Sequence, residues 1–255
     1  MKLALREAGD PRGLPVVLLH AFPMSSAMWE PQLGALKNFR VLLPDLRGFG
    51  ASPFSSPWFI EHAVDDLFDS LSSISVEKAV LVGLSMGGYV ALRAVEKNPS
   101  RVKALVLCDT RAEADANENK IKRAAAVDFV RARGVAAFLD PFLADALSSK
   151  TKTDKPKVVD FLKGVAGKSS PEAVMAALAA LASRGDMTAA LPGIKAPTAV
   201  LVGSQDKITP LPLSELIRSR VPGAELHLIP DAGHFSNAEN PEAFNDRLVS
   251  FLTRL

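Results

Sequence analysis

A serine between two glycines is the feature of this sequence best suited to chemistry. Residues 83–87 read Gly-Leu-Ser-Met-Gly, and they lie between the apolar run 79–82 and a stretch of helical period at 87–97. A turn this sharp between a strand and a helix strains the serine backbone, and only glycine at both flanks clears the chain that packs beside it. The turn also exposes the hydroxyl at a helix N-terminus, which favours developing negative charge. We therefore expect Ser85 to act as a nucleophile.

A serine nucleophile needs a base, and histidine is the usual one. The chain has four histidines, which are His20, His62, His227 and His234. His234 lies in a predicted loop between the last strand and the last helix, and open α/β sheets place their sites beyond the carboxyl ends of their strands. We expect His234 to be the general base and later the general acid, His227 to pack within its strand, and His62 to lie on the surface.

A carboxylate must hold the base in one tautomer. Asp206 lies just after a predicted strand, and the chain order Ser85…Asp206…His234 is the order expected for a serine in this kind of turn. Asp109 is a rival, because it also follows a strand and that strand lies nearer the serine. Asp231 is a weaker rival, because it is too close to His234 in sequence to orient the ring. Chain order and loop position favour Asp206.

Acyl transfer also needs two donors for the oxyanion of the tetrahedral intermediate. One is expected from the backbone N–H of Met86, the residue after the nucleophile, and the other from the loop after the first buried strand. In that loop Phe22 is the candidate donor, because Pro23 has no N–H. His20 lies beside the same loop, and we expect it to brace the loop by hydrogen bonds rather than to exchange protons.

The elements that must position these residues alternate along the chain. Short Val- and Leu-rich runs predict buried strands at 16–19, 40–43, 79–82, 104–108, 198–202 and 225–229. Helical stretches follow several of them, at 26–36, 60–71 and 87–97, and a final helix is expected over 241–254. Such uninterrupted apolar strands alternating with helices predict an α/β fold with a doubly wound, mostly parallel sheet. Residues 3–7 are expected to add an antiparallel edge strand.

The alternation stops between residues 111 and 190, where no convincing strand occurs. Helices are predicted there at 124–133, 134–147, 157–166 and 171–183. We interpret 111–190 as a helical cap inserted into a core domain made of 1–110 and 191–255. Phe138 and Phe142 of the cap are expected to line the substrate pocket with Trp29, whereas most apolar cap residues form the cap's own core. Arg111 and Arg123 either meet a substrate carboxylate or are exposed helix charges.

Composition excludes several classes of protein. The 255 residues carry a formal net charge of +2, which argues against a dedicated nucleic-acid surface. The lysine-rich segment 150–157 is interpreted as a solvated loop. Cys108 is the only cysteine, so no intrachain disulfide forms and a buried thiol is expected. No span of eighteen apolar residues occurs and Arg6 and Glu7 interrupt any signal-peptide core, so we expect a cytoplasmic protein with no membrane partner.

Several segments resemble the α/β-hydrolase superfamily, and the likeness extends over almost the whole chain. Residues 20–23, followed by Trp29, are similar to the family's H-G-F-P…W oxyanion segment, with Ala21 where most members have glycine. Residues 45–52 are similar to its structural D-x-R-G-x-G-x-S turn. Asp206 resembles the family's acid, and the pair at 233–234 resembles the position of its base.

Within that superfamily the chain is most similar to serine hydrolases of the small bacterial carboxylesterase and 3-oxoadipate enol-lactonase types. The resemblance implies hydrolysis of a small-molecule ester or lactone through an acyl-enzyme on Ser85, without a metal or other cofactor, in a monomer or homodimer. The non-haem haloperoxidases (perhydrolases) share the triad, so perhydrolysis at the same serine is an alternative. A non-catalytic, ligand-binding relative is an alternative from another class, and the complete set of triad residues disfavours it.

Overall fold

The computed structural model describes all 255 residues. Its centre is a seven-stranded sheet in the order β1-β3-β2-β4-β5-β6-β7. The strands are β1 (Leu5–Gly9), β2 (Pro15–Leu19), β3 (Arg40–Pro44), β4 (Ala79–Leu84), β5 (Val102–Cys108), β6 (Thr198–Gly203) and β7 (Glu225–Ile229). Only the edge strand β1 runs antiparallel, against β3, and every other neighbouring pair is parallel. The predicted fold class and the antiparallel edge strand are confirmed.

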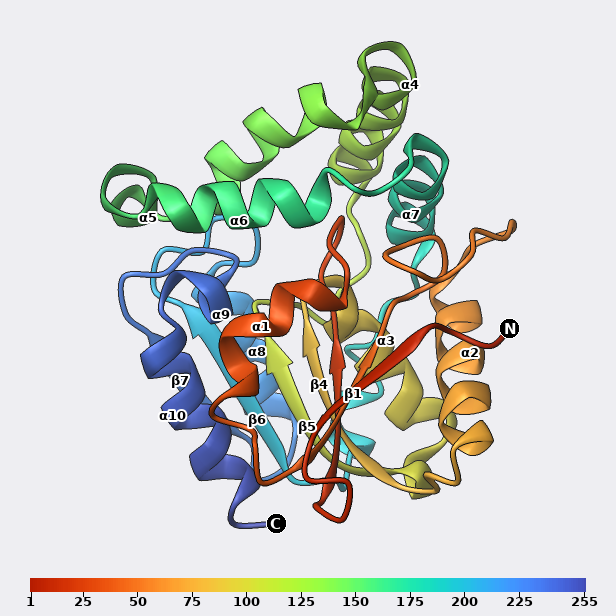
Figure 1. Ribbon diagram of the computed structural model, residues 1–255, viewed down its shortest axis with the longest axis vertical. Helices are drawn as coiled ribbons and strands as arrows, with labels where there is room; N and C mark the ends of the chain where they lie inside the picture. The colour runs from red at the N-terminus through yellow and green to blue at the C-terminus, as the bar shows by residue number, and fades with distance from the viewer.

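Helices flank this sheet on both sides (Figure 1). The α-helices outside the insertion are α1 (Glu30–Leu33), α2 (Ile60–Ser73), α3 (Met86–Lys97), α8 (Leu211–Arg220), α9 (Ser236–Glu239) and α10 (Pro241–Leu252). Three short 3-10 helices are η1 (Ser26–Trp29), η2 (Pro99–Arg101) and η3 (Leu191–Gly193). The helix predicted over 26–36 is therefore two short pieces, and α8 was not predicted. None of the helices combines the length and the apolar character that crossing a membrane requires.

The central strands form the densest part of the core. Every residue of β4 and of β6 is buried, because parallel strands covered on both faces expose neither side to water. Cys108, at the end of β5, has no exposed surface, as expected for a structural thiol. Burial, together with the charge of the neighbouring Asp109, raises the pKa of the thiol well above its usual value, so the sulfur stays protonated and unreactive.

Between β5 and β6 the chain inserts four helices, which we call the helical insertion. They are α4 (Asn117–Ala146), α5 (Ser149–Asp154), α6 (Pro156–Ala166) and α7 (Pro171–Ser183). In Figure 1 they lie above the carboxyl ends of the strands. Helix α4 breaks at Gly134, whose φ of 80° and ψ of 171° suit only glycine. The predicted division at 133/134 thus corresponds to this kink inside one long element.

The segment 150–157 is largely solvent-exposed, as expected, but it is helical rather than a loop. Ser148 accepts a hydrogen bond from the N–H of Thr151 and so caps α5, and Pro156 begins α6. Two of the lysines also have partners in the core domain. Lys150 pairs with Asp231 at 2.6 Å, and Lys155 donates to the backbone carbonyl of Glu239 at 2.6 Å. The charges therefore connect the helical insertion to the core.

Candidate active site

Ser85 occupies a strained turn between β4 and α3. Its φ of 53° and ψ of −111° lie outside the regions that a serine prefers. A Cβ on Gly83 would come within 2.3 Å of the Gly87 carbonyl oxygen, and one on Gly87 within 2.1 Å of the Leu19 carbonyl oxygen. Both positions therefore require glycine for steric reasons, as the sequence indicated, and the turn holds the serine hydroxyl above the end of the sheet.

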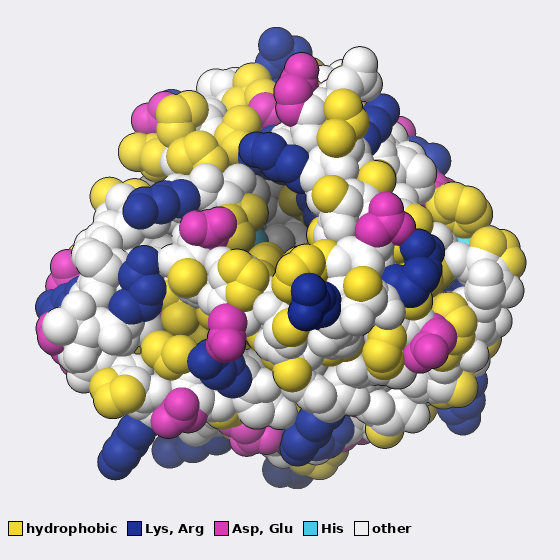
Figure 2. Space-filling view, turned by 90° about the horizontal axis from the view of Figure 1, so that it is seen from above, with side chains coloured by type: hydrophobic (Ala, Val, Ile, Leu, Met, Phe, Trp, Pro, Cys, Tyr) yellow, Lys and Arg dark blue, Asp and Glu magenta, His cyan; other side chains and the backbone are white.

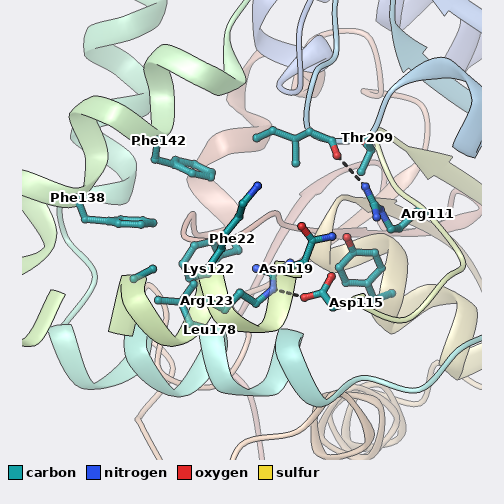
Figure 3. A pocket seen from close by; sticks show the side chains of 13 residues that line it. Phe22, Arg111, Asp115, Asn119, Lys122, Arg123, Phe138, Phe142, Leu178 and Thr209 are labelled. Carbon is teal, nitrogen blue, oxygen red and sulfur yellow. Dashed lines mark hydrogen bonds and ion pairs between the residues drawn. The ribbon is translucent and has the colours of Figure 1, made fainter. Parts of the chain in front are cut away.

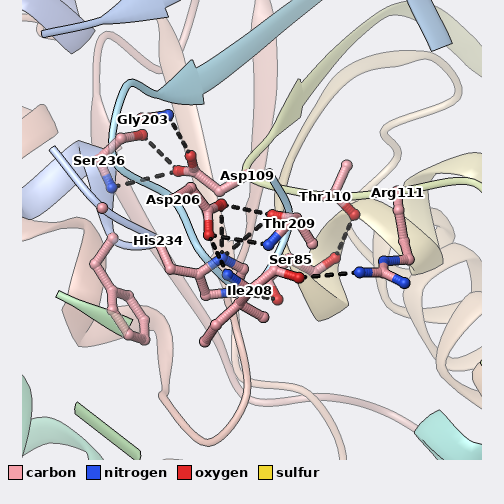
Figure 4. Close-up of polar contacts among 12 residues, drawn as sticks. Ser85, Asp109, Thr110, Arg111, Gly203, Asp206, Ile208, Thr209, His234 and Ser236 are labelled. Atoms are coloured by element: carbon pink, nitrogen blue, oxygen red, sulfur yellow. Dashed lines mark hydrogen bonds and ion pairs between the residues drawn. The ribbon is translucent and has the colours of Figure 1, made fainter. Parts of the chain in front are cut away.

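Three side chains from distant segments form a hydrogen-bonded line at this turn (Figure 4). The Ser85 hydroxyl lies 2.8 Å from Nε2 of His234, and Nδ1 of His234 lies 2.9 Å from a carboxylate oxygen of Asp206. Both distances suit proton transfer. The carboxylate accepts a hydrogen bond from Nδ1–H, so Nε2 carries the lone pair that faces the serine. The structure thus brings together the three residues predicted from chain order.

Asp206 is held as an anion by more than the histidine. Its Oδ1 accepts the backbone N–H groups of Ile208 at 2.8 Å and Thr209 at 2.9 Å, and its Oδ2 accepts the Thr209 hydroxyl at 2.5 Å. Burial opposes ionisation, but the charge of His234 and the hydrogen bonds from His234 and Thr209 outweigh it and lower the pKa of Asp206. Thr209 was missed in the sequence, although an Asp side chain in a turn commonly accepts the backbone N–H two residues further on, as Asp206 does from Ile208, which brings the next residue within reach.

The rival carboxylates have other partners. Asp109 is fully buried and accepts hydrogen bonds from the N–H of Gly203 at 2.8 Å and from the N–H and hydroxyl of Ser236. Burial, with the charge of Asp206, raises the pKa of Asp109 well above its usual value. Asp231 pairs with Lys150 instead of reaching a histidine. Neither carboxylate contacts the ring of His234.

The two backbone N–H groups that the sequence predicts as oxyanion donors have no acceptor within the protein. They belong to Met86, the first residue of α3, and to Phe22, in the loop after β2. Both residues are buried, at 0% and 6% exposure, and buried amides are nearly always paired. Free donors at this place suit an oxyanion.

His20 braces the loop that carries Phe22. Its Nε2 accepts the N–H of Leu46 at 2.9 Å, and its Nδ1 donates to the Ala21 carbonyl at 3.0 Å. Burial lowers the pKa of His20, so the ring stays neutral and both bonds persist. The expectation of a bracing role agrees with these contacts.

The remaining histidines lie away from the triad. His62 is half-buried with its ring 5.5 Å from that of Phe59, and His227 is half-buried and lies 3.1 Å from Glu225. His227 is therefore not packed in the core as expected. Neither ring contacts Ser85 or Asp206.

A cavity of about 240 Å³ lies beside the triad, under the helical insertion (Figure 3). Its lining includes Phe22 of the oxyanion loop and Thr209, which contacts His234 at 3.3 Å and Asp206. The insertion contributes Phe138 and Phe142, as expected from the sequence. Figure 2 shows the hollow from above, with basic side chains at its rim. No set of three or more His, Cys, Asp or Glu side chains is arranged to hold a metal ion.

Trp29 does not line this cavity. It is fully buried, and its ring packs against Phe244 of α10 at a centroid distance of 6.2 Å. The structure therefore places Trp29, the last residue of η1, in the core of the sheet domain. The expectation that it contacts substrate came from its neighbourhood in sequence, and packing directs its side chain elsewhere.

Glu239 is a buried carboxylate that the sequence reasoning missed. Its Oε1 accepts the N–H groups of Gly233 at 2.9 Å and Phe235 at 3.2 Å, and its Oε2 accepts the N–H of Ser148 at 2.8 Å. The first two residues flank His234, whose own N–H donates to the Ala146 carbonyl at 2.8 Å. The Glu239 side chain thus fixes the loop that carries His234 to the start of α5. Only these three-dimensional contacts, and no sequence pattern, identify Glu239 as a positioning residue.

We expect Glu239→Gln to lower kcat for an ester substrate about 10- to 100-fold while KM changes little. A glutamine can accept from only one of its two ends, so its NH₂ group would face either the Ser148 N–H or the pair flanking His234. Stopped-flow and steady-state kinetics measure the separate changes in kcat and KM. The matched control is Glu242→Gln on the neighbouring helix α10. Equal kcat values for the Glu239→Gln variant and the wild type would refute the positioning role.

Comparisons with known proteins place this geometry in context. A family model described as alpha/beta hydrolase fold matches residues 15–241. A thermophilic esterase from Thermogutta terrifontis, solved with malate bound, is 36% identical with a TM-score of 0.94, covering 99% of this chain and 93% of that one. The enol-lactonase from Burkholderia xenovorans LB400 is 27% identical with a TM-score of 0.92, covering 98% and 96%. The putative carbamate hydrolase RutD of Variovorax paradoxus is 29% identical, covering 100% and 97%.

Proposed function

This chain belongs to the α/β-hydrolase fold family, and from that membership we propose that it hydrolyses small carboxylic esters or lactones through an acyl-enzyme on Ser85. The observation that carries the proposal is the line Ser85–His234–Asp206, with distances of 2.8 and 2.9 Å, beside the free N–H groups of Phe22 and Met86. Likeness to an esterase and to an enol-lactonase supports ester and lactone carbonyls as the target.

In the first step Oγ of Ser85 attacks the carbonyl carbon while Nε2 of His234 takes the hydroxyl proton. The carbonyl oxygen becomes an oxyanion and accepts the N–H groups of Phe22 and Met86. When the tetrahedral intermediate collapses, the bond to the leaving oxygen breaks and the imidazolium returns its proton to that oxygen. Asp206 stabilises the imidazolium between these two proton transfers. Its lowered pKa keeps the carboxyl ionised at neutral pH, and the negative charge attracts the imidazolium.

In the second step water attacks the acyl-enzyme, and His234 again takes the proton and then gives it to Ser85. For a lactone, the leaving oxygen remains attached to the acyl chain, so ring opening yields one hydroxy acid. Residues 111–190 would act as a cap that selects what reaches Ser85. The cavity of about 240 Å³, with Phe138 and Phe142 in its wall, supports a small acyl group rather than a long chain.

The experiment is a turnover screen of p-nitrophenyl esters from two to eight carbons with a set of five- and six-membered lactones. We expect measurable kcat/KM on short acyl groups and a decline beyond the length that the cavity holds. Turnover of none of these esters or lactones by a folded preparation would overturn the proposal.

Two variants of the chemistry are tested by adding a carbamate, or hydrogen peroxide with a halide, to this screen. Likeness to a putative carbamate hydrolase favours a carbamate as a second candidate, because attack by Ser85 on a carbamate carbonyl uses the same donors. Perhydrolysis is the other variant, in which hydrogen peroxide replaces water at the acyl-enzyme. Release of ammonia from a carbamate, or halogenation dependent on hydrogen peroxide, distinguishes these from simple ester hydrolysis.

A further inference from the structure

The helical insertion contacts the loop after β2, which carries Phe22, in two ways. The Phe22 ring packs against Phe138 and Phe142 of α4, with ring centroids 6.1 and 6.0 Å apart. The connection between α6 and α7 adds a polar contact, because the hydroxyl of Ser169 donates to the backbone carbonyl of Pro23 at 3.0 Å. In Figure 1 the loop after β2 rises from the sheet toward the insertion. The insertion thus contacts both the predicted oxyanion donor and the residue that follows it.

Two neighbouring serines in this connection have different partners. Ser169 is 8% exposed, and its own N–H donates to the Ala166 carbonyl at the end of α6 at 3.1 Å. Ser170 is exposed, and its hydroxyl caps α7 by accepting the N–H of Ala173 at 3.2 Å. Ser170 therefore stabilises its own helix, whereas the buried hydroxyl of Ser169 is paired with the loop that carries the predicted donor. A buried hydroxyl and a buried carbonyl both lose free energy unless they are paired.

The Pro23 carbonyl belongs to a tight turn over residues 21–24. The N–H of Met24 donates to the Ala21 carbonyl at 2.8 Å and closes the turn, and Nδ1 of His20 donates to the same carbonyl at 3.0 Å. The N–H of Phe22 takes no part in either bond. The core therefore holds this turn at Ala21, and the insertion holds it at Pro23. Two attachments fix the direction of the donor between them better than one, and an oxyanion donor is effective only when it is oriented in advance.

We infer that Ser169 is a positioning residue of the oxyanion site, so that the helical insertion orients an oxyanion donor as well as covering the cavity. The inference rests on the proposed function, because it concerns the Phe22 N–H that would bind the oxyanion. The hydroxyl of Ser169 fixes the Pro23 carbonyl, and with it the turn that presents the Phe22 N–H. Without this hydroxyl the Pro23 carbonyl has lost its partner from the insertion, and the donor samples other directions. Efficient attack on a carbonyl then depends on contact between the α6–α7 connection and the loop.

The first test is the steady-state kinetics of Ser169→Ala with p-nitrophenyl butyrate. We expect kcat to fall about tenfold while KM stays within about twofold of the wild-type value. Outright removal of an oxyanion donor costs about 100- to 1,000-fold in kcat, and the loss of its support should cost less. Both chemical steps form an oxyanion, so kcat falls whichever step limits the rate.

The matched control is Ser170→Ala, which removes a hydroxyl from the adjacent residue. Each variant loses one hydrogen bond made by a serine hydroxyl of this connection, so each Tm should fall by about 2–4 °C. The kcat of Ser170→Ala should stay within about twofold of the wild-type value, because its hydroxyl supports only α7. A merely structural role of Ser169 predicts equal kcat values for the two variants. That result would overturn the inference while leaving ester hydrolysis at Ser85 intact.

Inhibition by trifluoromethyl butyl ketone reports the oxyanion site without turnover. Attack by Oγ of Ser85 forms a C–O bond to the carbonyl carbon, the carbonyl oxygen becomes an oxyanion, and the hydroxyl proton passes to His234. The dissociation constant of this ketone, measured by isothermal titration, should rise about tenfold in Ser169→Ala and less than about twofold in Ser170→Ala. The dissociation constant of methyl butyl ketone, which binds without a stable oxyanion, should change less than about twofold in both variants.

The titration separates failure of the inference from failure of the proposed reaction. Equal affinity of the wild type and Ser169→Ala for the trifluoromethyl ketone would overturn the positioning role even if esters are hydrolysed. A wild type that binds this ketone more tightly than methyl butyl ketone, but turns over no ester or lactone, would overturn only the proposed reaction. A wild type that binds both ketones equally would overturn both.

Discussion

Replacing Ser85 with alanine is expected to lower kcat for p-nitrophenyl butyrate by about four orders of magnitude or more. The hydroxyl is the only group at hydrogen-bond distance, 2.8 Å, from the lone pair of His234, so no other side chain can form the acyl-enzyme. The N–H groups of Phe22 and Met86 remain, and their stabilisation of the oxyanion accounts for the residual rate. Steady-state kinetics at saturating substrate measure the effect.

The control for this variant is Ser219→Ala, because Ser219 lies on the exposed part of α8 and bonds only to the carbonyl of its own helix at Leu216. It should have the wild-type rate. Thermal unfolding should show that Ser85→Ala is folded, since removal of the hydroxyl leaves the glycine-framed turn unchanged. A Ser85→Ala rate within tenfold of the wild-type rate would mean that hydrolysis occurs elsewhere.

Replacing Asp206 with asparagine should lower kcat by about three to four orders of magnitude. An asparagine NH₂ group facing Nδ1 of His234 would favour the tautomer that carries its proton on Nε2. That nitrogen then cannot accept the proton of Ser85. Asp109→Asn should cost less than about tenfold, because Asp109 bonds to Gly203 and Ser236 rather than to the histidine.

The pair of aspartate variants discriminates between the two acids that the sequence offered. Both side chains are buried, so each variant should first be shown to unfold cooperatively. A larger loss of kcat in Asp109→Asn than in Asp206→Asn would mean that Asp109, after β5, orients His234, and it would contradict our assignment of that role to Asp206, after β6. It would require a different arrangement of the loop after β6 during turnover.

The serine turn was predictable because its causes are local. Gly83 is required by backbone atoms four and five residues away, and Gly87 is required by Leu19 on the adjacent strand β2. The strand–turn–helix order is visible in the hydrophobic pattern of the sequence. Asp206 and His234 were predictable because a parallel sheet brings the carboxyl ends of its strands to one edge. Chain order therefore sufficed to choose Asp206 over Asp109.

Other parts of the site depend on contacts that leave no pattern in the sequence. Glu239 bonds to Ser148, which is 91 residues away, and no spacing rule connects them. The lysine-rich segment 150–157 was interpreted as a loop on the basis of its charge alone, and the helix N-cap at Ser148 was overlooked. Asp115 pairs with both Arg123 and Arg184, which is 69 residues further along the chain, and no sequence pattern connects these three residues.

The most direct test of the central claim, that Ser85 is the nucleophile, is peptide mass spectrometry after reaction with a fluorophosphonate probe. We expect one adduct per chain, on Ser85, formed rapidly in the wild type and on the order of a thousandfold more slowly in His234→Ala, because the hydroxyl then lacks its base. An adduct on another serine, or no adduct in a folded protein that still hydrolyses esters, would contradict it.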